Sequence, residues 1–274
     1  MTIPLLHPVL FANPAKPLID VITGLGLREN LKLCLDAGDF QSAATSAPDK
    51  WLDRSGGGYD FFLGSGTGAD AADPTFSGSV GELRPSASWS SDAGDYFTYD
   101  TTNEAWMENL HKDNAVGTYA AWVYLGSTGA HELIADSSNA LANVGILFRT
   151  AATTKFLRLR VFQGGGVSAA LDQTGTVAVN DSAWAFVAFS ITEATGANGL
   201  TFVVNGSSES FTSTYSSPSA AGATNTLHLC SRGDGTIPFP SGSRIGGVMM
   251  WEGTALTATH LNSIYQATRG RYSV

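Results

Sequence analysis

The stretch from Trp184 to Gly206 constrains the fold of this chain more than any other. Apolar side chains occupy both sets of alternating positions in residues 184–192: Trp184, Phe186 and Ala188 on one side, and Val187, Phe189 and Ile191 on the other. Because side chains alternate between the two faces of a strand, this strand is expected to be covered on both faces. A second strand is expected at Leu200–Asn205, and Asn205-Gly206 is a pair that tight hairpin turns prefer.

Composition supports a large all-β core. Hydrophobic residues make up 43% of the 274 residues, charged residues only 14%, and there are 31 glycines. This balance is typical of short strands joined by small-residue turns, and sandwiches of this length are common as single domains. The formal net charge of −9, without any basic run, argues against nucleic acid as a partner. No run of eighteen apolar residues occurs, so no membrane-spanning helix is expected.

Several other segments have periodic apolar patterns that predict strands and one helix. The inward positions are expected to be Leu31, Leu33 and Leu35 in 31–38, and Leu157, Leu159 and Val161 in 155–162. The segment 243–252 is expected to direct Ile245, Met249 and Trp251 to one face and Val248 and Met250 to the other. Residues 131–136 and 143–149 are predicted to form a hairpin pair. A short C-terminal helix should begin near Thr257 and bury Leu261, Ile264 and Tyr265.

Residues 1–30 are predicted to form an extended arm and a short helix ahead of a domain at 31–274. Four prolines in residues 1–17 disfavour helix and favour an extended path. The arm carries six large apolar side chains, which we expect to form a partner-binding segment: Ile3, Leu5, Leu6, Val9, Leu10 and Phe11. The alternative is that the arm packs on its own domain. Residues 17–27 are expected to form one or two helical turns that Gly24 and Gly26 end.

Several separated motifs agree in order. They are Leu35-Asp36-Ala37-Gly38, Trp51-x-Asp53-x-Ser55-Gly56, Phe62-Leu63-Gly64, Asp95-Tyr96-Phe97, and a closing strand with Trp251 followed by a short helix. With the 184–206 stretch, they resemble the laminin-G-like domain of the concanavalin A-like lectin/glucanase superfamily, as found in bacteriophage structural proteins. The resemblance covers residues 31–274. It implies an all-β, two-sheet antiparallel jelly-roll sandwich with short peripheral helices and the arm outside it.

Asp53 and the two cysteines have structural interpretations that the sequence favours. Asp53 can accept hydrogen bonds from loop amides near Ser55. A calcium site at Asp53 or Asp60 is the alternative, but acidic residues are sparse there for a full coordination shell. Cys34 and Cys230 are far apart and lack metal-ligand spacing, so we expect two buried free thiols, with a disulfide as the alternative.

Patterns typical of catalysis are absent from the sequence. Glucanases of the superfamily carry Glu-x-Asp-x-x-Glu on one strand, and this chain has no such spacing. The nearest pair, Glu104 and Glu108, has helical spacing and suits a solvated face. No nucleophile elbow, zinc-protease motif or phosphate loop occurs. Of five histidines, His131 is the one candidate ligand, and a neutral surface histidine is the favoured alternative. We therefore predict a protein that is not an enzyme and that uses no metal or other cofactor.

Arg158 and Arg160 project from one face of a strand, two residues apart. Two guanidiniums on one face can bind a carboxylate or an acidic sugar, or contact a neighbouring subunit. An ordinary solvated face is the favoured alternative.

The resemblance implies a virion structural protein: a capsid decoration, head-fibre or tail-associated component, made in the host cytoplasm. The arm would anchor the jelly roll to capsid or tail proteins, and a homo-oligomer is expected. The alternative is a carbohydrate-binding module that recognises host-surface or matrix glycans. A glycoside hydrolase is disfavoured by the missing carboxylate pair, and no nucleic-acid or membrane partner is expected. Fold alone does not decide between these functions.

Overall fold

The 184–206 stretch forms two neighbouring strands, β12 (Trp184–Thr192) and β13 (Leu200–Val204), which pair antiparallel. Asn205 and Gly206 both have positive φ, 49° and 83°, and lead directly into β14 (Ser207–Phe211). The predicted hairpin turn is therefore confirmed. The computed structural model describes residues 15–44, 46–92, 94–126, 129–166, 168–216 and 218–274. The six apolar arm residues from Ile3 to Phe11 lie outside the described residues.

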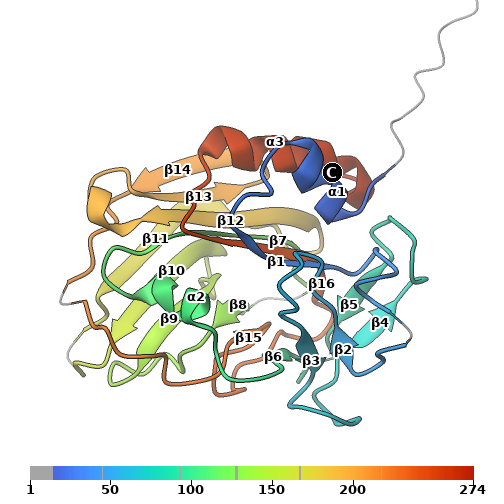
Figure 1. Cartoon of the computed structure of the whole chain (residues 1–274), viewed down its shortest axis with the longest axis horizontal. Coiled ribbons are helices and arrows are strands. Elements are labelled where there is room, and N and C mark those ends of the chain that lie inside the picture. The colour runs from blue at the N-terminus through green and yellow to red at the C-terminus, as the bar shows by residue number, and fades with distance from the viewer. Residues whose placement is uncertain (1–14, 45, 93, 127–128, 167, 217) are drawn as a thin grey trace, which may run out of the picture.

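Two antiparallel sheets pack face to face, and helices cover the outer face of one of them (Figure 1). The first sheet has the order β14-β13-β12-β7-β16-β5-β4, with β1 paired to β16, and the second has the order β11-β10-β9-β8-β15-β6-β3-β2. Each contains eight strands among the described residues. The predicted two-sheet jelly roll is thus confirmed.

The remaining strands of the first sheet are β1 (Leu31–Asp36), β4 (Thr75–Ser77), β5 (Ser88–Ser90), β7 (Val116–Tyr124) and β16 (Arg244–Glu252). The second sheet contains β2 (Lys50–Trp51), β3 (Phe61–Leu63), β6 (Phe97–Tyr99), β8 (Glu132–Ala135), β9 (Val144–Thr150), β10 (Phe156–Gln163), β11 (Leu171–Ala178) and β15 (His228–Leu229). The helices are α1 (Leu18–Gly24), α2 (Ala105–Glu108), η1 (Asn109–His111), η2 (Glu193–Thr195), α3 (Ala258–Thr268) and η3 (Arg269–Tyr272). No helix in this described part is long and apolar enough to cross a membrane.

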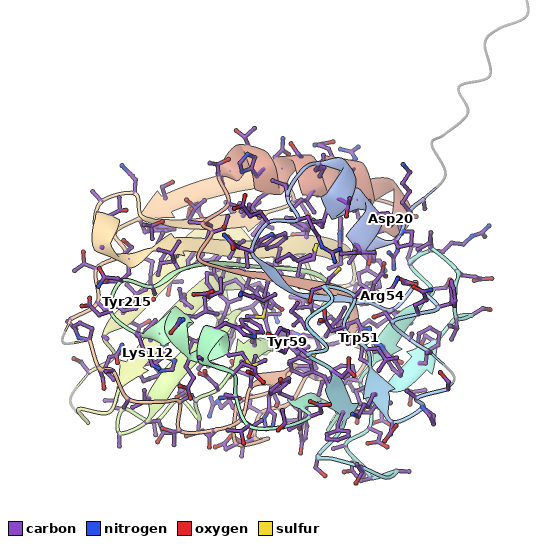
Figure 2. All side chains as sticks on the ribbon, in the orientation of Figure 1. Asp20, Trp51, Arg54, Tyr59, Lys112 and Tyr215 are labelled. Carbon is purple, nitrogen blue, oxygen red and sulfur yellow. The ribbon has the colours of Figure 1, made fainter. Side chains whose placement is uncertain are left out.

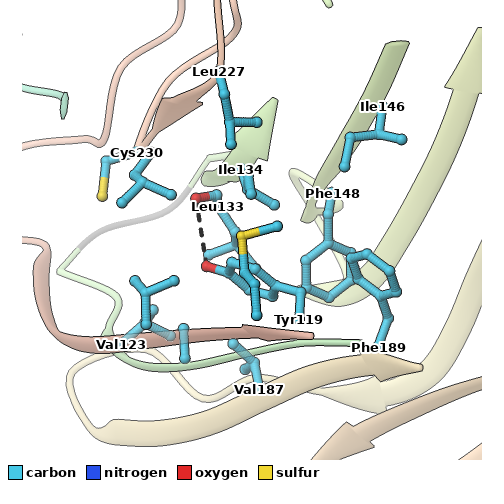
Figure 3. Close-up of a cluster of buried hydrophobic side chains, with 14 of the residues drawn as sticks. Tyr119, Val123, Leu133, Ile134, Ile146, Phe148, Val187, Phe189, Leu227 and Cys230 are labelled. Carbon is cyan, nitrogen blue, oxygen red and sulfur yellow. Dashed lines mark hydrogen bonds between the residues drawn. The ribbon is translucent and has the colours of Figure 1, made fainter. Parts of the chain in front are cut away.

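The main core lies between the two sheets, where side chains fill the space between the ribbons (Figure 2). Tyr119 of β7 and Phe189 of β12 meet Phe148 of the second sheet, with ring centroids 5.5 Å and 4.9 Å from that of Phe148 (Figure 3). The Tyr119 hydroxyl donates to the Leu133 carbonyl at 3.5 Å. Burying each such ring contributes about 1.5–3 kcal/mol, so this layer provides most of the hydrophobic stabilisation of the sandwich.

A second core covers the other face of the first sheet. Trp184 and Phe186 of β12 lie there with Trp122 of β7, beneath α1, α3 and η3. Trp122 stacks on Tyr272 with ring centroids 4.2 Å apart, and its Nε1 donates to Thr268 Oγ1 at 3.0 Å. The prediction that 184–192 is covered on both faces is therefore confirmed.

The helical layer is joined to the first sheet through Asp36, at the end of β1. Its carboxylate accepts the backbone N–H of Leu18 at 2.8 Å and both terminal nitrogens of Arg271, at 2.9 Å and 2.5 Å. Both members of the ion pair are buried. One side chain thus connects α1, β1 and η3.

Two predicted strand faces are wrong, and both errors have the same cause. Leu31 lies in the helix-side core with Cys34, whereas Leu33 and Leu35 face the other sheet. Ile245 faces the other sheet, not the side of Met249. The β1–β16 register shifts between Leu31 and Leu33, and the β16–β7 register shifts between Ile245 and Gly247. A bulge moves every residue beyond it to the opposite face, which simple alternation cannot predict.

We expect Trp184→Ala to lower the free energy of unfolding by about 3–5 kcal/mol. The Trp184 side chain is only 8% exposed and packs against Tyr272, with ring centroids 4.9 Å apart. The measurement is the chemical-denaturation midpoint at unchanged slope. Phe40→Ala is the control, since Phe40 is 63% exposed and should change stability by no more than about 0.5 kcal/mol. Equal effects of the two substitutions would contradict the central position of β12.

Candidate functional site

Strand β10 carries Arg158 and Arg160 on the outer face of the second sheet, and the inward positions Leu157, Leu159 and Val161 are buried in the main core. The predicted alternation of this strand is confirmed. Arg158 is directly opposite Arg149 of β9, and Arg160 is opposite Asp172 of β11. Two like charges in direct cross-strand register oppose sheet pairing, so neighbouring carboxylates are needed.

Asp172 binds both predicted arginines. Arg158 donates from Nε and Nη2 to the two carboxylate oxygens, at 2.7 Å and 2.6 Å. Arg160 Nε lies 3.1 Å from Asp172 Oδ2, and its Nη1 donates to Asn139 Oδ1. The Arg160 guanidinium also lies over the Phe162 ring, 4.8 Å from the centroid. The structure therefore holds both side chains in fixed orientations.

A second carboxylate extends this arrangement across β8. Glu132 Oε1 accepts from Arg149 Nη1 at 3.3 Å and from Arg232 Nε at 3.1 Å. Glu132 is fully buried, and its Oε2 has no hydrogen-bond partner among the described residues. Arg149 Nε is a second buried polar atom without a partner in that part of the chain. We call the set Arg149, Arg158, Arg160 and Arg232 the arginine face.

The electrostatics of the arginine face are dominated by positive charge. Four guanidiniums share two carboxylates, a local excess of two positive charges on a protein of net charge −9. Burial lowers the pKa of Arg160, and the charges of Arg158 and Arg149 lower it further, against the attraction of Asp172. Burial alone would raise the pKa of Asp172, but the hydrogen bonds from Arg158 and the charge of Arg160 hold it below its usual value. An additional anion would reduce this repulsion.

At Glu132, burial changes the pKa of the carboxyl more than the neighbouring arginines do. It raises the pKa of the Glu132 carboxyl, although Arg149 and Arg232 lower it. The arginine face is thus a rigid, partly exposed array of N–H donors in planar pairs. Such donors bind carboxylates and phosphates in a bidentate manner.

Sequence reasoning found Arg158 and Arg160 but missed Arg149, Arg232, Glu132 and Asp172. The outward direction of Arg149 could have been predicted from alternation, because Ile146 and Phe148 of the same strand face the core. Arg232 lies in a loop after β15, where no periodicity indicates direction.

His131 is buried, not a surface residue, so the expected surface position is wrong. Burial, assisted by the charge of Lys155, lowers its pKa to about 4. Its ring meets Phe239 edge-on at 5.7 Å, and Nδ1 lies 3.4 Å from Thr150 Oγ1. The ring is therefore neutral at physiological pH, as the favoured alternative expected.

Asp53 braces its loop as predicted. Its Oδ1 accepts from the backbone N–H groups of Cys34 and Ser55, at 2.9 Å and 2.8 Å, and its Oδ2 accepts from Ser55 Oγ and the Tyr59 N–H. Asp60 Oδ1 accepts the Asp53 N–H at 2.8 Å. Within the described ranges, no group of three or more His, Cys, Asp or Glu residues could hold a metal ion. Cys34 and Cys230 are free and buried, which confirms the predicted thiols.

Another buried polar pair, His111 and Asp136, lies where η1 meets the end of β8. His111 Nδ1 is 3.7 Å from Asp136 Oδ2, and both side chains are fully buried. Asp136 Oδ1 accepts the Ile146 N–H at 2.6 Å. Burial raises the pKa of Asp136 to about 7 and lowers that of His111. Both shifts favour the uncharged form of the group concerned.

Comparison with protein families supports the architecture. A laminin-G family model, described as the concanavalin A-like lectin/glucanases superfamily, matches residues 91–262, more than half of the chain. No curated protein sequence matches the chain.

Several solved structures share the fold at low sequence identity. The binding domain of botulinum neurotoxin DC in complex with SialylT has a TM-score of 0.56 and 12% identity, over 88% of this chain and 52% of that one. The same binding domain in complex with rat synaptotagmin II has a TM-score of 0.57 and 11% identity, with the same coverage. Trypanosoma rangeli sialidase in complex with sialic acid has a TM-score of 0.55 and 10% identity, over 89% and 34%. This chain therefore spans about half or less of those proteins.

We expect Asp136 to make the protein less stable as pH rises. A carboxyl whose pKa is raised by folding adds to the free energy of unfolding. This stabilisation is fully present below its ordinary pKa near 4 and is lost as pH rises through about 7. Asp136→Asn keeps an oxygen for the Ile146 N–H and removes the titration. Between pH 5 and pH 8 the free energy of unfolding of the wild type should fall by about 2–3 kcal/mol relative to that of this variant. Chemical denaturation at each pH measures it. Asp113→Asn, at an exposed position, is the matched control, and parallel pH profiles of wild type and Asp136→Asn would contradict the assignment.

Proposed function

The chain belongs to the concanavalin A-like lectin/glucanases superfamily, and from this we propose that it is a carbohydrate-binding domain that recognises acidic glycans through the arginine face. A carboxylate-bearing sugar is the ligand class that suits this surface. The carboxylate would bind planar guanidinium donors, and the sugar hydroxyls would bind the neighbouring polar side chains of the sheet edge.

The observation that carries the proposal is the excess of arginine over carboxylate on this one face. Arg158 and Arg149 are in direct cross-strand register, an arrangement that weakens a sheet unless an anion is nearby. Asp172 compensates Arg158 and Arg160, and Glu132 compensates Arg149 and Arg232. Because each carboxylate is paired with two guanidiniums, the positive charge of the site is only half neutralised. A carboxylate of the ligand can therefore bind there.

Two of the similar structures support the choice of ligand class. One is a binding domain in complex with SialylT and another is a sialidase in complex with sialic acid, a sugar that carries a carboxylate. At 10–12% identity these likenesses concern the fold. The chemistry of the ligand follows from the arginines of this chain.

We expect the protein to bind sialylated or uronic-acid glycans in preference to their neutral counterparts on a glycan array. Arg158→Gln with Arg160→Gln should weaken binding about tenfold or more, since hydrogen bonds to a charged group contribute about 1.5–3 kcal/mol. Arg269→Gln, on the helical layer, is the matched control for the loss of positive charge. Titration calorimetry with one sialylated oligosaccharide and its desialylated form measures the difference. Equal binding of the two sugars, or unchanged binding by the double variant, would refute the assignment.

We also propose that the domain does not catalyse hydrolysis. Glu104, just before α2, accepts a hydrogen bond from the Tyr99 hydroxyl at 3.1 Å, and Glu108 at the end of α2 pairs with Lys112 at 3.1 Å. Purified protein should show no turnover of β-glucans, agar, alginate or sialosides in a reducing-sugar or released-sialate assay. Turnover that disappears in Glu104→Gln or Glu108→Gln would show an active site that the sequence pattern did not reveal.

The virion role stays a prediction. It depends on the arm, residues 1–14 of which lie outside the described residues, and the similar proteins named above are a neurotoxin binding domain and a sialidase. Cosedimentation with purified particles tests it directly, and loss of cosedimentation on changing the arm would support it.

A further inference from the structure

A groove of about 690 Å³ lies in the helical layer, on the opposite side of the first sheet from the arginine face. Its apolar walls come from α1, from the segment before β5 and from α3: Val21, Leu25, Leu83, Pro85 and Ala267. Leu25 is 38% exposed, one of few large apolar side chains that the described surface leaves open. Apolar surface of this kind commonly marks a docking site.

One residue of the groove wall has a buried hydrogen-bond donor without a partner in the described part of the chain. Arg271 lines it, is 5% exposed and uses its terminal nitrogens on Asp36, but its Nε has no partner among the described residues. A buried N–H without a partner costs about 1–3 kcal/mol. An acceptor that enters the groove, such as a backbone carbonyl, would remove this cost.

The described chain begins at the rim of this groove. Ala15 and Lys16 line it, and Asp20 of α1 lies at the same end of the molecule (Figure 2). The sequence before them, MTIPLLHPVLFANP, contains no acidic residue, lysine or arginine. It has six large aliphatic or aromatic side chains between Ile3 and Phe11. Prolines 4, 8 and 14 lack N–H groups but keep their carbonyls. Such a segment offers apolar side chains that can pack on the apolar walls of the groove, and carbonyl oxygens that can accept hydrogen bonds.

We propose that residues 1–14 of one copy dock in the helical-layer groove of a second copy, and that the exchange is reciprocal. Pro14 and Pro17 disfavour a helical conformation of the residue before each of them, which favours an arm able to reach a neighbouring copy. On an extended path of about 3.1 Å per residue, fourteen residues reach about 40 Å, enough to cross to a neighbouring protein. Because every copy carries both arm and groove, a two-fold dimer satisfies both at once.

Full-length protein should therefore form a dimer by light scattering after size-exclusion chromatography, with little dependence on salt because the arm lacks charged side chains. Leu25→Lys places a charge in the groove, and Leu5→Lys with Leu6→Lys places charges in the arm. Each variant should be monomeric while keeping the melting temperature of the wild-type domain to within a few degrees. Ile237→Lys is the matched control, since Ile237 is 45% exposed, lies outside the groove and should leave the dimer intact.

Mixing the two monomeric variants distinguishes exchange from other contacts. The Leu25→Lys chain keeps a native arm and the arm variant keeps a native groove, so one arm–groove pair is available and a heterodimer should form. Crosslinking between differently labelled chains measures it. A monomeric wild type at all concentrations would overturn the proposal, as would variants that remain dimeric. A mixture that stays monomeric would show that the arm docks on its own domain or on another protein.

Discussion

The helical layer and the first sheet depend on one buried ion pair, that between Asp36 and Arg271. A buried carboxylate requires hydrogen bonds to almost every lone pair, and Asp36 obtains them from Leu18, Gly38 and Arg271. Removing either charge would leave the other buried and unpaired, which costs about 3–5 kcal/mol. The pair fixes α1 and η3 over Trp122 and Trp184, whose side chains would otherwise form an exposed aromatic face.

This arrangement explains why the two sheets differ in surface chemistry. The central strands of the first sheet, β7, β12 and β16, are apolar on both faces and are covered on both, so they have no solvent face to carry a ligand site. The second sheet has one core face and one outer face, and its outer residues are free to be charged. Arginine is suited to that position because its guanidinium stays charged while its stem packs on neighbours, as Arg160 does over Phe162.

The two proposed interaction surfaces lie on opposite layers of the molecule. Two copies joined through the helical-layer groove would present both arginine faces outward. Glycan binding by single domains is weak in many systems, and two linked sites raise the effective affinity for a surface that displays many copies of the sugar. Self-association and ligand binding would then act together without sharing a residue.

The sequence alone determined the fold class, the central strand, the hairpin at Asn205-Gly206 and the outward direction of Arg158 and Arg160. These features depend on local alternation and on turn chemistry, which neighbouring residues encode. Tertiary structure decided the faces of Leu31 and Ile245, because bulges reverse alternation without a sequence signal that a single chain reveals. It also decided the site. Asp172, Glu132, Arg149 and Arg232 come from three strands and a loop, and only the register of the second sheet brings them around Arg158 and Arg160. Such long-range pairing is set by the packing of whole layers, so residue patterns along the chain do not contain it.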